Sequence, residues 1–384
     1  MVAKLRFFPV GNGDMTLVIT EHGFKILVDC HIRQAADDID DSTPDVAKEL
    51  RDQLTRDSTG RLFVHAFLLS HPDKDHCCGM KRHFHLGAPA DWSKSADKIF
   101  INEMWSSPMV FRRASRCHVL CDDALAFNAE ARRRVRRFRD TFGVVDSGDR
   151  ILILGEDENG KTDDLGQILI KVDQQFSRVD GQYDPTMTAR LLAPHPKGDE
   201  GEEAARSKNH SSVAINFSLA GDGVADACRF LTGGDAEVLI WERMWDRHKM
   251  RPDWLRYDIL QAPHHCSWHS LSWDSWSEKG EKAKVSPDAR SALSQTRSGA
   301  VIVASSRAIK DDEVDPPCIR AKREYEDIAK AAKGSFKCVG EPEINPKSLV
   351  FEIGKHGPRL LAAGLGASIL VGSGAVGNQA LAHG

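Results

Sequence analysis

The stretch FVHAFLLSHPDKDH, residues 63–76, decides the fold of this chain and points to its chemistry. Its first seven residues are apolar on both faces, which is typical of a strand buried in the middle of a sheet. The strand runs directly into a polar loop that holds His71, Asp73, Asp75 and His76 within six residues. In layered α/β folds, chemistry collects at the ends of such strands. The stretch therefore predicts a functional site at the edge of a sheet.

The residue types in this loop indicate metal binding. His and Asp are both good ligands for a divalent cation of intermediate softness. Positions i and i+2 of a tight loop (71 and 73) can reach one ion, while i+4 and i+5 (75 and 76) can reach another. Two ions about 3.5–4 Å apart would form a two-metal hydrolytic centre. The alternative, a surface loop with chance polar residues, rarely places four ligand-type residues directly after an apolar strand.

Composition limits the class of protein. The chain has 384 residues, 41% hydrophobic and 28% charged, so it can bury a sizeable core and is not disordered, collagen-like or a multi-span membrane protein. A formal net charge of −4 excludes a globally basic nucleic-acid binder but not a local basic patch. Nine scattered cysteines without a CxxC pair, and an N-terminus without a secretory signal, favour a reducing, cytoplasmic location.

Strand and helix patterns follow in an order that suits two sheets with helices outside. We expect one α/β sandwich domain at 1–354, with a helical, Arg-rich insertion at about 82–148, a loop at 177–209, and a small-residue apolar tail at 355–384. The expected helices are 43–57, 129–140, 236–247 and 318–333. The expected strands are 4–10, 15–20, 25–28, 63–69, 99–102, 150–154, 167–172, 212–219, 228–232, 258–261, 300–305, 337–339 and 349–353.

The metal loop resembles the HxHxDH signature of the metallo-β-lactamase superfamily, with Asp in place of the second His. Further stretches resemble, in order, motifs of the metallo-β-lactamase-type domain of bacterial DNA-uptake (competence) channel proteins and their soluble relatives. The resemblance covers about residues 4–353, and its metal and PHH motifs are specific. The supporting matches are VGNGD (10–14) with VGQGD, ILVD (26–29) with LLID, SSVAI (211–215) with NxSSLVL, LTGGD (231–235) with LTGD, and PHHCS (263–267) with PHHGS.

The resemblance implies a four-layer αββα sandwich with two divalent metal ions at one edge, between the sheets. Zn²⁺ is the expected metal, and the carboxylate-rich ligand set leaves Mn²⁺ open. A water between the ions would be the nucleophile, with its pKa lowered toward 7 by the metal charge. The residues carried over are His71 and Asp73 for one ion, Asp75 and His76 for the second, Asp235 as a bridge, and one of His264 and His265 to complete the second site; Asp75, His76 and Asp235 are the expected catalytic residues.

Three departures from the family pattern leave questions open. Many superfamily members place a histidine ligand just before the strand that starts here at residue 212; His210 is either that ligand or a loop histidine. Cys266 replaces the glycine of PHHGS, and we expect its thiol to pack near the site. Asp315 stands where the DNA-uptake relatives often have a histidine, so it either takes over that role or the role is absent. We expect Asp14 and Asp29 to brace turns and to support the ligands rather than to bind metal.

Two features bear on the substrate. Nine arginines lie between residues 112 and 139. They either bind phosphate, which guanidinium groups hold in a bidentate way, or belong to a solvated helix that pairs with the protein's own acidic residues or binds a partner. Trp268 follows the PHH motif and can stack on a base or simply pack, and Ser305 ends a strand near the expected site and can donate to a phosphate. The expected substrate-binding residues are therefore Arg133, Arg134, Arg136, Arg137, Trp268 and Ser305.

We predict a metal-dependent hydrolase, most specifically a phosphodiesterase or nuclease acting on nucleic acid or a nucleotide. A second hypothesis is hydrolysis of a small ester, lactone or amide, for which the tryptophans would line an apolar pocket. A third is a subunit of a larger assembly, with the Arg-rich insertion or the tail as a surface for a protein partner. Residues 360–376 carry no charge and are near the lower length limit for a membrane span, but their glycines make them weakly hydrophobic, so we expect no clear span. The sequence leaves the oligomeric state open.

Overall fold

The computed structural model describes residues 1–108, 119–157, 160–195 and 208–361. They form a mixed α/β fold with two large sheets and a small β-hairpin, β10 (Arg178–Val179) with β11 (Gln182–Tyr183). The first sheet has the order β19-β18-β1-β2-β3-β5-β6-β7-β8, with β4 paired to β5. Its strands are β1 (Ala3–Phe7), β2 (Thr16–Ile19), β3 (Lys25–Val28), β4 (Thr55–Arg56), β5 (Leu62–Leu69), β6 (Phe100–Ser106), β7 (Arg150–Leu154), β8 (Leu169–Ile170), β18 (Leu349–Gly354) and β19 (Gly357–Leu360).

The second sheet repeats the plan of the first, because each joins an antiparallel meander to a parallel run. Its order is β17-β16-β15-β14-β13-β12-β9, antiparallel from β9 to β14 and parallel from β14 to β17. In the first sheet the change to parallel pairing occurs between β3 and β5. The strands of the second sheet are β9 (Gln175–Phe176), β12 (Met187–Ala193), β13 (Ala214–Gly221), β14 (Val224–Thr232), β15 (Tyr257–Gln261), β16 (Thr296–Arg307) and β17 (Ser335–Gly340).

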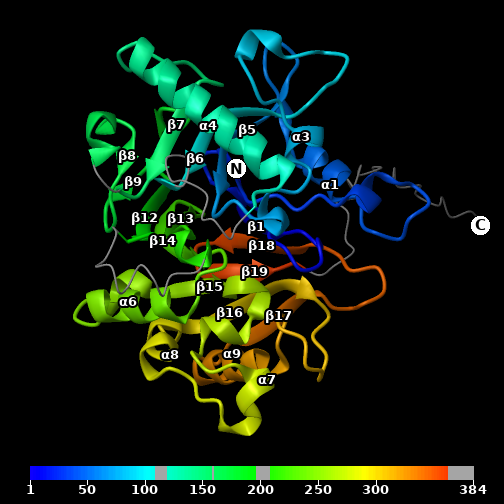
Figure 1. The fold of residues 1–384 in the computed structure, drawn as a ribbon, viewed down its shortest axis with the longest axis vertical. Helices are drawn as coiled ribbons and strands as arrows, with labels where there is room; N and C mark the ends of the chain where they lie inside the picture. The colour runs from blue at the N-terminus through cyan, green and yellow to red at the C-terminus, as the bar shows by residue number, and fades with distance from the viewer. Residues whose placement is uncertain (109–118, 158–159, 196–207, 362–384) are drawn as a thin grey trace, which may run out of the picture.

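Helices cover the sheets on their outer sides, while the inner faces of the sheets pack against each other (Figure 1). The sequence of β5 is apolar because both faces of the strand are buried. Ala66 and Leu68 lie in the core between the sheets, and Val64 and Phe67 lie in the core under the helices. The helices over the first sheet are α1 (Val46–Gln53), α3 (Met80–His83) and α4 (Asp122–Asp140). Those over the second are α6 (Val238–His248), α8 (Pro287–Leu293) and α9 (Ile319–Ala331). The short α2 (Lys74–Cys77) follows β5, and α7 (Trp276–Lys279) follows the PHH region.

The structure corrects several predicted boundaries. The helix expected at 43–57 is shorter, because Asp45 caps it by accepting from the Lys48 N–H, and residues 55–56 pair with β5 as β4. The strand expected at 99–102, within the 82–148 segment, is present and extends further, as β6, which pairs with β5 and β7. The loop expected at 177–209 contains β12, a strand in the interior of the second sheet. The expected tail begins with β19, which pairs with β18; the rest of it, from residue 362, lies outside the described residues. Within the described residues, none of the helices has the length and apolar character that crossing a membrane requires.

Candidate metal centre

Three strand ends from the two sheets bring the metal-loop residues together with Asp235 and the PHH motif. β5 ends at Leu69 and leads into the loop and α2, β14 ends two residues before Gly234, and β15 leads into the turn Pro263–Cys266. Gly234 has φ +50, and a Cβ there would lie 2.6 Å from Ser70 Oγ, so only glycine allows this close approach. The backbone also ties the segments together: the His264 N–H donates to Gly234 O at 3.0 Å, and the Val213 N–H donates to Ser70 O at 2.9 Å.

The carboxylate of Asp235 lies between two groups of side chains. Its Oδ2 is 3.5 Å from Nε2 of His71 and 3.5 Å from Nε2 of His264. Its Oδ1 is 2.9 Å from Nε2 of His76 and 3.4 Å from Nε2 of His265. Metal–ligand bonds of about 2.0–2.1 Å in a tetrahedron place neighbouring ligand atoms about 3.3 Å apart, so these separations suit ligands that share an ion.

One further carboxylate joins each group. Asp73 Oδ2 is 3.7 Å from Nε2 of His71, on the side of Asp235 Oδ2. Asp75 Oδ2 is 3.3 Å from Nε2 of His265, on the side of Asp235 Oδ1. The arrangement therefore offers two neighbouring sets of nitrogen and carboxylate ligands with Asp235 common to both.

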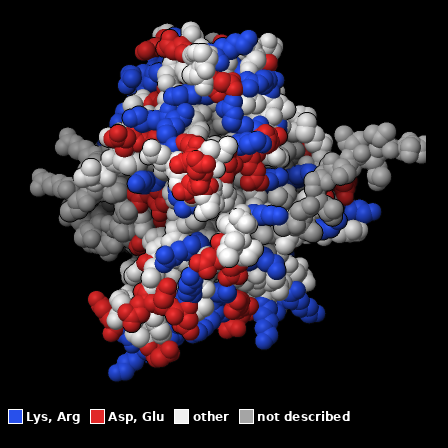
Figure 2. All heavy atoms as spheres, turned by 90° about the vertical axis from the view of Figure 1, so that its right-hand side faces the viewer, with Lys and Arg blue, Asp and Glu red and all other residues white. Residues whose placement is uncertain are grey.

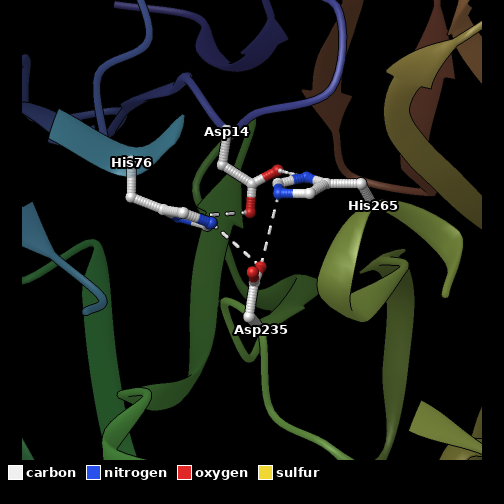
Figure 3. Close-up of side chains that lie close together, drawn as sticks. All are labelled: Asp14, His76, Asp235 and His265. Carbon is white, nitrogen blue, oxygen red and sulfur yellow. Dashed lines mark ion pairs between the residues drawn. The ribbon is translucent and has the colours of Figure 1, made fainter. Parts of the chain in front are cut away.

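Two more buried carboxylates face the opposite ring nitrogens of the second group. Asp29 Oδ2 is 2.8 Å from Nδ1 of His76, and Asp14 Oδ1 is 3.3 Å from Nδ1 of His265. Asp14, His76, Asp235 and His265 each place a ligand atom within 4.8 Å of the others, so these four could also hold one ion (Figure 3). We favour a supporting role for Asp14 and Asp29 over metal binding. A carboxylate that pairs with Nδ1 of a histidine fixes the orientation of the ring and leaves Nε2 free to bind a metal.

Electrostatics of the cluster favour a cation. Burial disfavours protonation of the rings, but the surrounding carboxylates together outweigh it: Asp235 and Asp73 raise the pKa of His71 to about 9, and Asp235, Asp14 and Asp75 raise that of His265 to about 10. Burial would raise the pKa of Asp235, yet the rings of His76, His265 and His71 hold it well below its usual range. Among the described residues, the buried atoms His71 Nε2, His76 Nε2 and Asp235 Oδ1 make no hydrogen bond of good geometry, although His76 Nε2 and Asp235 Oδ1 are only 2.9 Å apart. The donor set fits a divalent metal, which would satisfy these atoms and balance the carboxylates.

The backbone at the PHH motif is strained. His264, His265 and Cys266 have φ angles of 51°, 52° and 69°, three successive non-glycine residues in the left-handed region. Such conformations cost on the order of 1–3 kcal/mol each and persist where the surroundings impose them, which happens most often at functional sites. Here the strain turns both imidazoles toward Asp235. The Cys266 thiol is fully buried in the core under α6, α8 and α9, as expected from the sequence.

Sequence reasoning missed the support supplied by Ser70, the residue between the strand and the first histidine. Its N–H and hydroxyl both donate to the Asp29 carboxylate at 2.7 Å, and its hydroxyl lies 3.2 Å from Nδ1 of His71 and of His76. The only sequence signal for this role is that Ser70 lies directly between the buried strand and the first histidine of the metal loop. His210 belongs to the short turn Lys208–Ser211, and its side chain lies outside the described residues.

Of the four chosen arginines, Arg134 is buried and cannot contact phosphate, while Arg133 is partly exposed and pairs with the protein's own acidic residues. Arg134 is buried, with its guanidinium donating to Glu130 and to the carbonyls of Ile101, Asn102 and Arg150. Arg133 is bound by Glu130 at 2.7 Å and by Asp149 at 2.6 Å.

The other two chosen arginines are exposed. Arg137 lies 3.6 Å from Asp149, and Arg136 has no ion pair with any described residue. Figure 2 shows Lys and Arg interspersed with Asp and Glu on the face that it presents, without one broad basic area.

Trp268 and Ser305 are also buried and make hydrogen bonds within the protein, so Trp268 packs rather than stacking on a base, and Ser305 does not face substrate. The Trp268 indole is fully buried and donates to Asp274 O at 2.9 Å. The Ser305 hydroxyl donates to Gly13 O at 2.8 Å, so it supports the 11–14 loop. Asp315 accepts from the Trp268 N–H at 3.2 Å and braces the turn after the PHH motif.

Comparison with known proteins gives little further information. No protein-family profile and no curated protein sequence matches this chain. Among solved structures, the crystal structure of unliganded yeast PDE1 is similar over 88% of this chain and 98% of that chain, with 11% sequence identity and a TM-score of 0.41. A likeness this weak supports no assignment of fold or function, which therefore depends on the geometry of the site.

Proposed function

We propose that this chain is a metal-dependent hydrolase with a binuclear centre, built on the four-layer αββα sandwich of the metallo-β-lactamase superfamily. The observation that carries the proposal is the position of Asp235, whose two carboxylate oxygens face the Nε2 atoms of four different histidines. A buried carboxylate shared by two ligand groups is what a bridging ligand requires. The site also lies where each sheet changes to parallel pairing, a common position for ligand sites in α/β folds.

We assign the ligands by which oxygen of Asp235 they face. The first set would be His71, Asp73 and His264, and the second would be Asp75, His76 and His265. We place His265, rather than His264, in the second set because Nε2 of His265 lies 3.3 Å from Oδ2 of Asp75. Two divalent ions, Zn²⁺ or Mn²⁺, would supply a nucleophilic water at neutral pH and neutralise charge that develops on the substrate.

The chain's own residues would hold this centre rigidly. Asp29 and Ser70 fix the ring of His76, and Asp14 fixes the ring of His265, so that each presents Nε2 inward. The carboxylate of Asp75 is half-exposed while those of Asp14 and Asp235 are buried, so Asp75 is the carboxylate among them that can reach a water entering from solvent.

Phosphodiesters of nucleotides or nucleic acids are the proposed substrates. The motif resemblance favours them, and cationic centres suit the negative charge of a phosphodiester in its transition state. The small-ester alternative depended on an apolar pocket lined by the tryptophans after the PHH motif. Trp268 is buried in the core and cannot line such a pocket.

The test is hydrolysis by the purified protein with its bound metal. The substrates are single- and double-stranded DNA, RNA, cyclic nucleotides and a lactone panel, with Asp75→Ala compared throughout. Asp140→Ala, which changes an exposed carboxylate at the end of α4, is the matched control. We expect phosphodiester cleavage by the wild type and the control that is lost in Asp75→Ala. Equal turnover by all three proteins would exclude the two-metal mechanism, and cleavage of lactones alone would favour the small-ester hydrolase.

A further inference from the structure

A pocket of about 380 Å³ lies beside the loop that carries Asp14. It is formed by the segment 9–11 between β1 and β2, by residues 307–314 after β16, and by residues 340–346 after β17, with Arg33 on its wall. The segments around Arg33 and around 340–346 lie on the right-hand side of Figure 1, the face turned toward the viewer in Figure 2. The volume is within the range of pockets that bind small molecules, about 300–1,000 Å³.

The pocket adjoins the candidate metal centre. Gly11 lines the pocket, and a Cβ on it would lie 3.6 Å from the guanidinium carbon of Arg33. Three residues further on, Asp14 faces the ring of His265. Three residues of extended chain span at most about 11 Å, so Gly11 on the pocket wall lies at most about that far along the backbone from Asp14 at the centre.

The loop between the pocket and the centre is held in place from both sides. The Asn12 side chain accepts from the Arg307 N–H at 3.0 Å and donates to Pro316 O at 2.9 Å. Gly13 is required at its position, because a Cβ there would lie 1.9 Å from Nδ1 of His31. The loop therefore couples the position of the pocket wall to that of Asp14.

The charges of the pocket favour an anion. Its wall carries Arg33, Arg307 and Lys310 against Asp312 and Glu343. Lys310 is paired with Glu343 at 2.8 Å, and Asp312 accepts from the Val314 N–H at 3.0 Å.

The two arginines of the wall remain available for a ligand. Within the described parts of the chain, neither Arg33 nor Arg307 has an ion pair with a carboxylate. The pKa of Asp41 is lowered mainly by hydrogen bonds from Thr43, and the positive charge of Arg33 lowers it further. Two guanidinium groups that line the same pocket suit a phosphate, which guanidinium groups bind in a bidentate way.

We infer that this pocket binds a second phosphate of the substrate, the one next to the phosphodiester that is cut. The inference rests on the proposed function. It gives that function a substrate class, namely oligonucleotides and end-phosphorylated dinucleotides rather than cyclic mononucleotides, which carry a single phosphate. The exposed Arg136 on α4, far from the pocket in the sequence, provides a matched control for changes of arginine to methionine.

Binding of inorganic phosphate, measured by isothermal titration calorimetry, tests the pocket without hydrolysis. The proteins are the wild type, the double variant Arg33→Met/Arg307→Met, and Arg136→Met, each also prepared with Asp235→Asn to disable the proposed centre. We expect the double variant to weaken binding roughly tenfold or more in both backgrounds, since hydrogen bonds from charged groups are lost. Equal binding by the double variant and the Arg136→Met control would overturn the inference. Thermal unfolding of each variant confirms that it is folded.

Kinetics test the assignment to a second phosphate. The wild type should cleave a dinucleotide with a terminal phosphate more efficiently than the same dinucleotide without it, mainly through a lower KM. The double variant should lose most of that preference, and Arg136→Met should keep it. Equal kcat/KM for the two dinucleotides in the wild type would overturn the assignment. Cleavage of neither would refute the proposed function, while the calorimetry would still decide whether the pocket binds phosphate.

Discussion

Replacing Arg134 with methionine should destabilise the protein by about 3 kcal/mol, although Arg134 belongs to an arginine run that could be taken for a phosphate-binding face. Methionine keeps the apolar stem but removes donors to the carbonyls of Ile101, Asn102 and Arg150, at 3.0, 3.3 and 3.0 Å. Three hydrogen bonds to buried acceptors contribute about 1 kcal/mol each. The variant also loses the buried ion pair between Arg134 and Glu130, which by itself would cost more. Arg133 still pairs with Glu130 and limits this cost.

Urea unfolding with linear extrapolation measures this free energy. The control is Arg136→Met, whose exposed side chain should change stability by less than about 0.5 kcal/mol. Equal stability of the two variants would refute the structural role of Arg134. Loss of nucleic-acid binding by a stable Arg134→Met protein would restore the phosphate-binding interpretation of this helix.

Two further predictions concern buried carboxylates. Asp29→Asn should weaken metal binding by roughly 10- to 100-fold in competition with a chromogenic chelator, because His76 loses its carboxylate support; unchanged affinity would remove Asp29 from the site. Burial raises the pKa of Glu103 to about 7 from a usual value near 4.5, so the folded protein binds the extra proton and loses stability as pH rises between these values. Glu103→Gln can still accept from the Trp105 indole and the Asp180 N–H and should flatten that pH dependence in urea unfolding; an unaltered slope would contradict the assignment.

The sequence was most informative where the relevant residues are close together along the chain. The ligand spacing in the 71–76 loop and the apolar run of β5 were recognisable because both are local patterns. Asp235 and the PHH motif follow other strands, β14 and β15, and only the motif resemblance connected them to the loop. β12 was missed because it lies in a segment rich in polar residues, although Met187, Ala189 and Leu191 alternate as a strand requires.

Charge alone could not reveal which arginines are buried. Arg134 lies on the same face of α4 as Phe127, Ala131 and Phe138, at helical spacings of four, seven and eleven residues from Phe127. That periodicity was a usable signal for burial. The hydrogen bonds that compensate the charge come from the strands β6 and β7, and no local pattern in α4 predicts them.

Metal content per chain tests the central claim most directly. Inductively coupled plasma mass spectrometry on the wild type, saturated with Zn²⁺ or Mn²⁺ and freed of excess ion, should find about two ions per chain. Asp235→Asn, which removes the shared carboxylate and keeps its size, should retain fewer than one. One ion or none in the wild type, or two in Asp235→Asn, would contradict a binuclear centre bridged by Asp235.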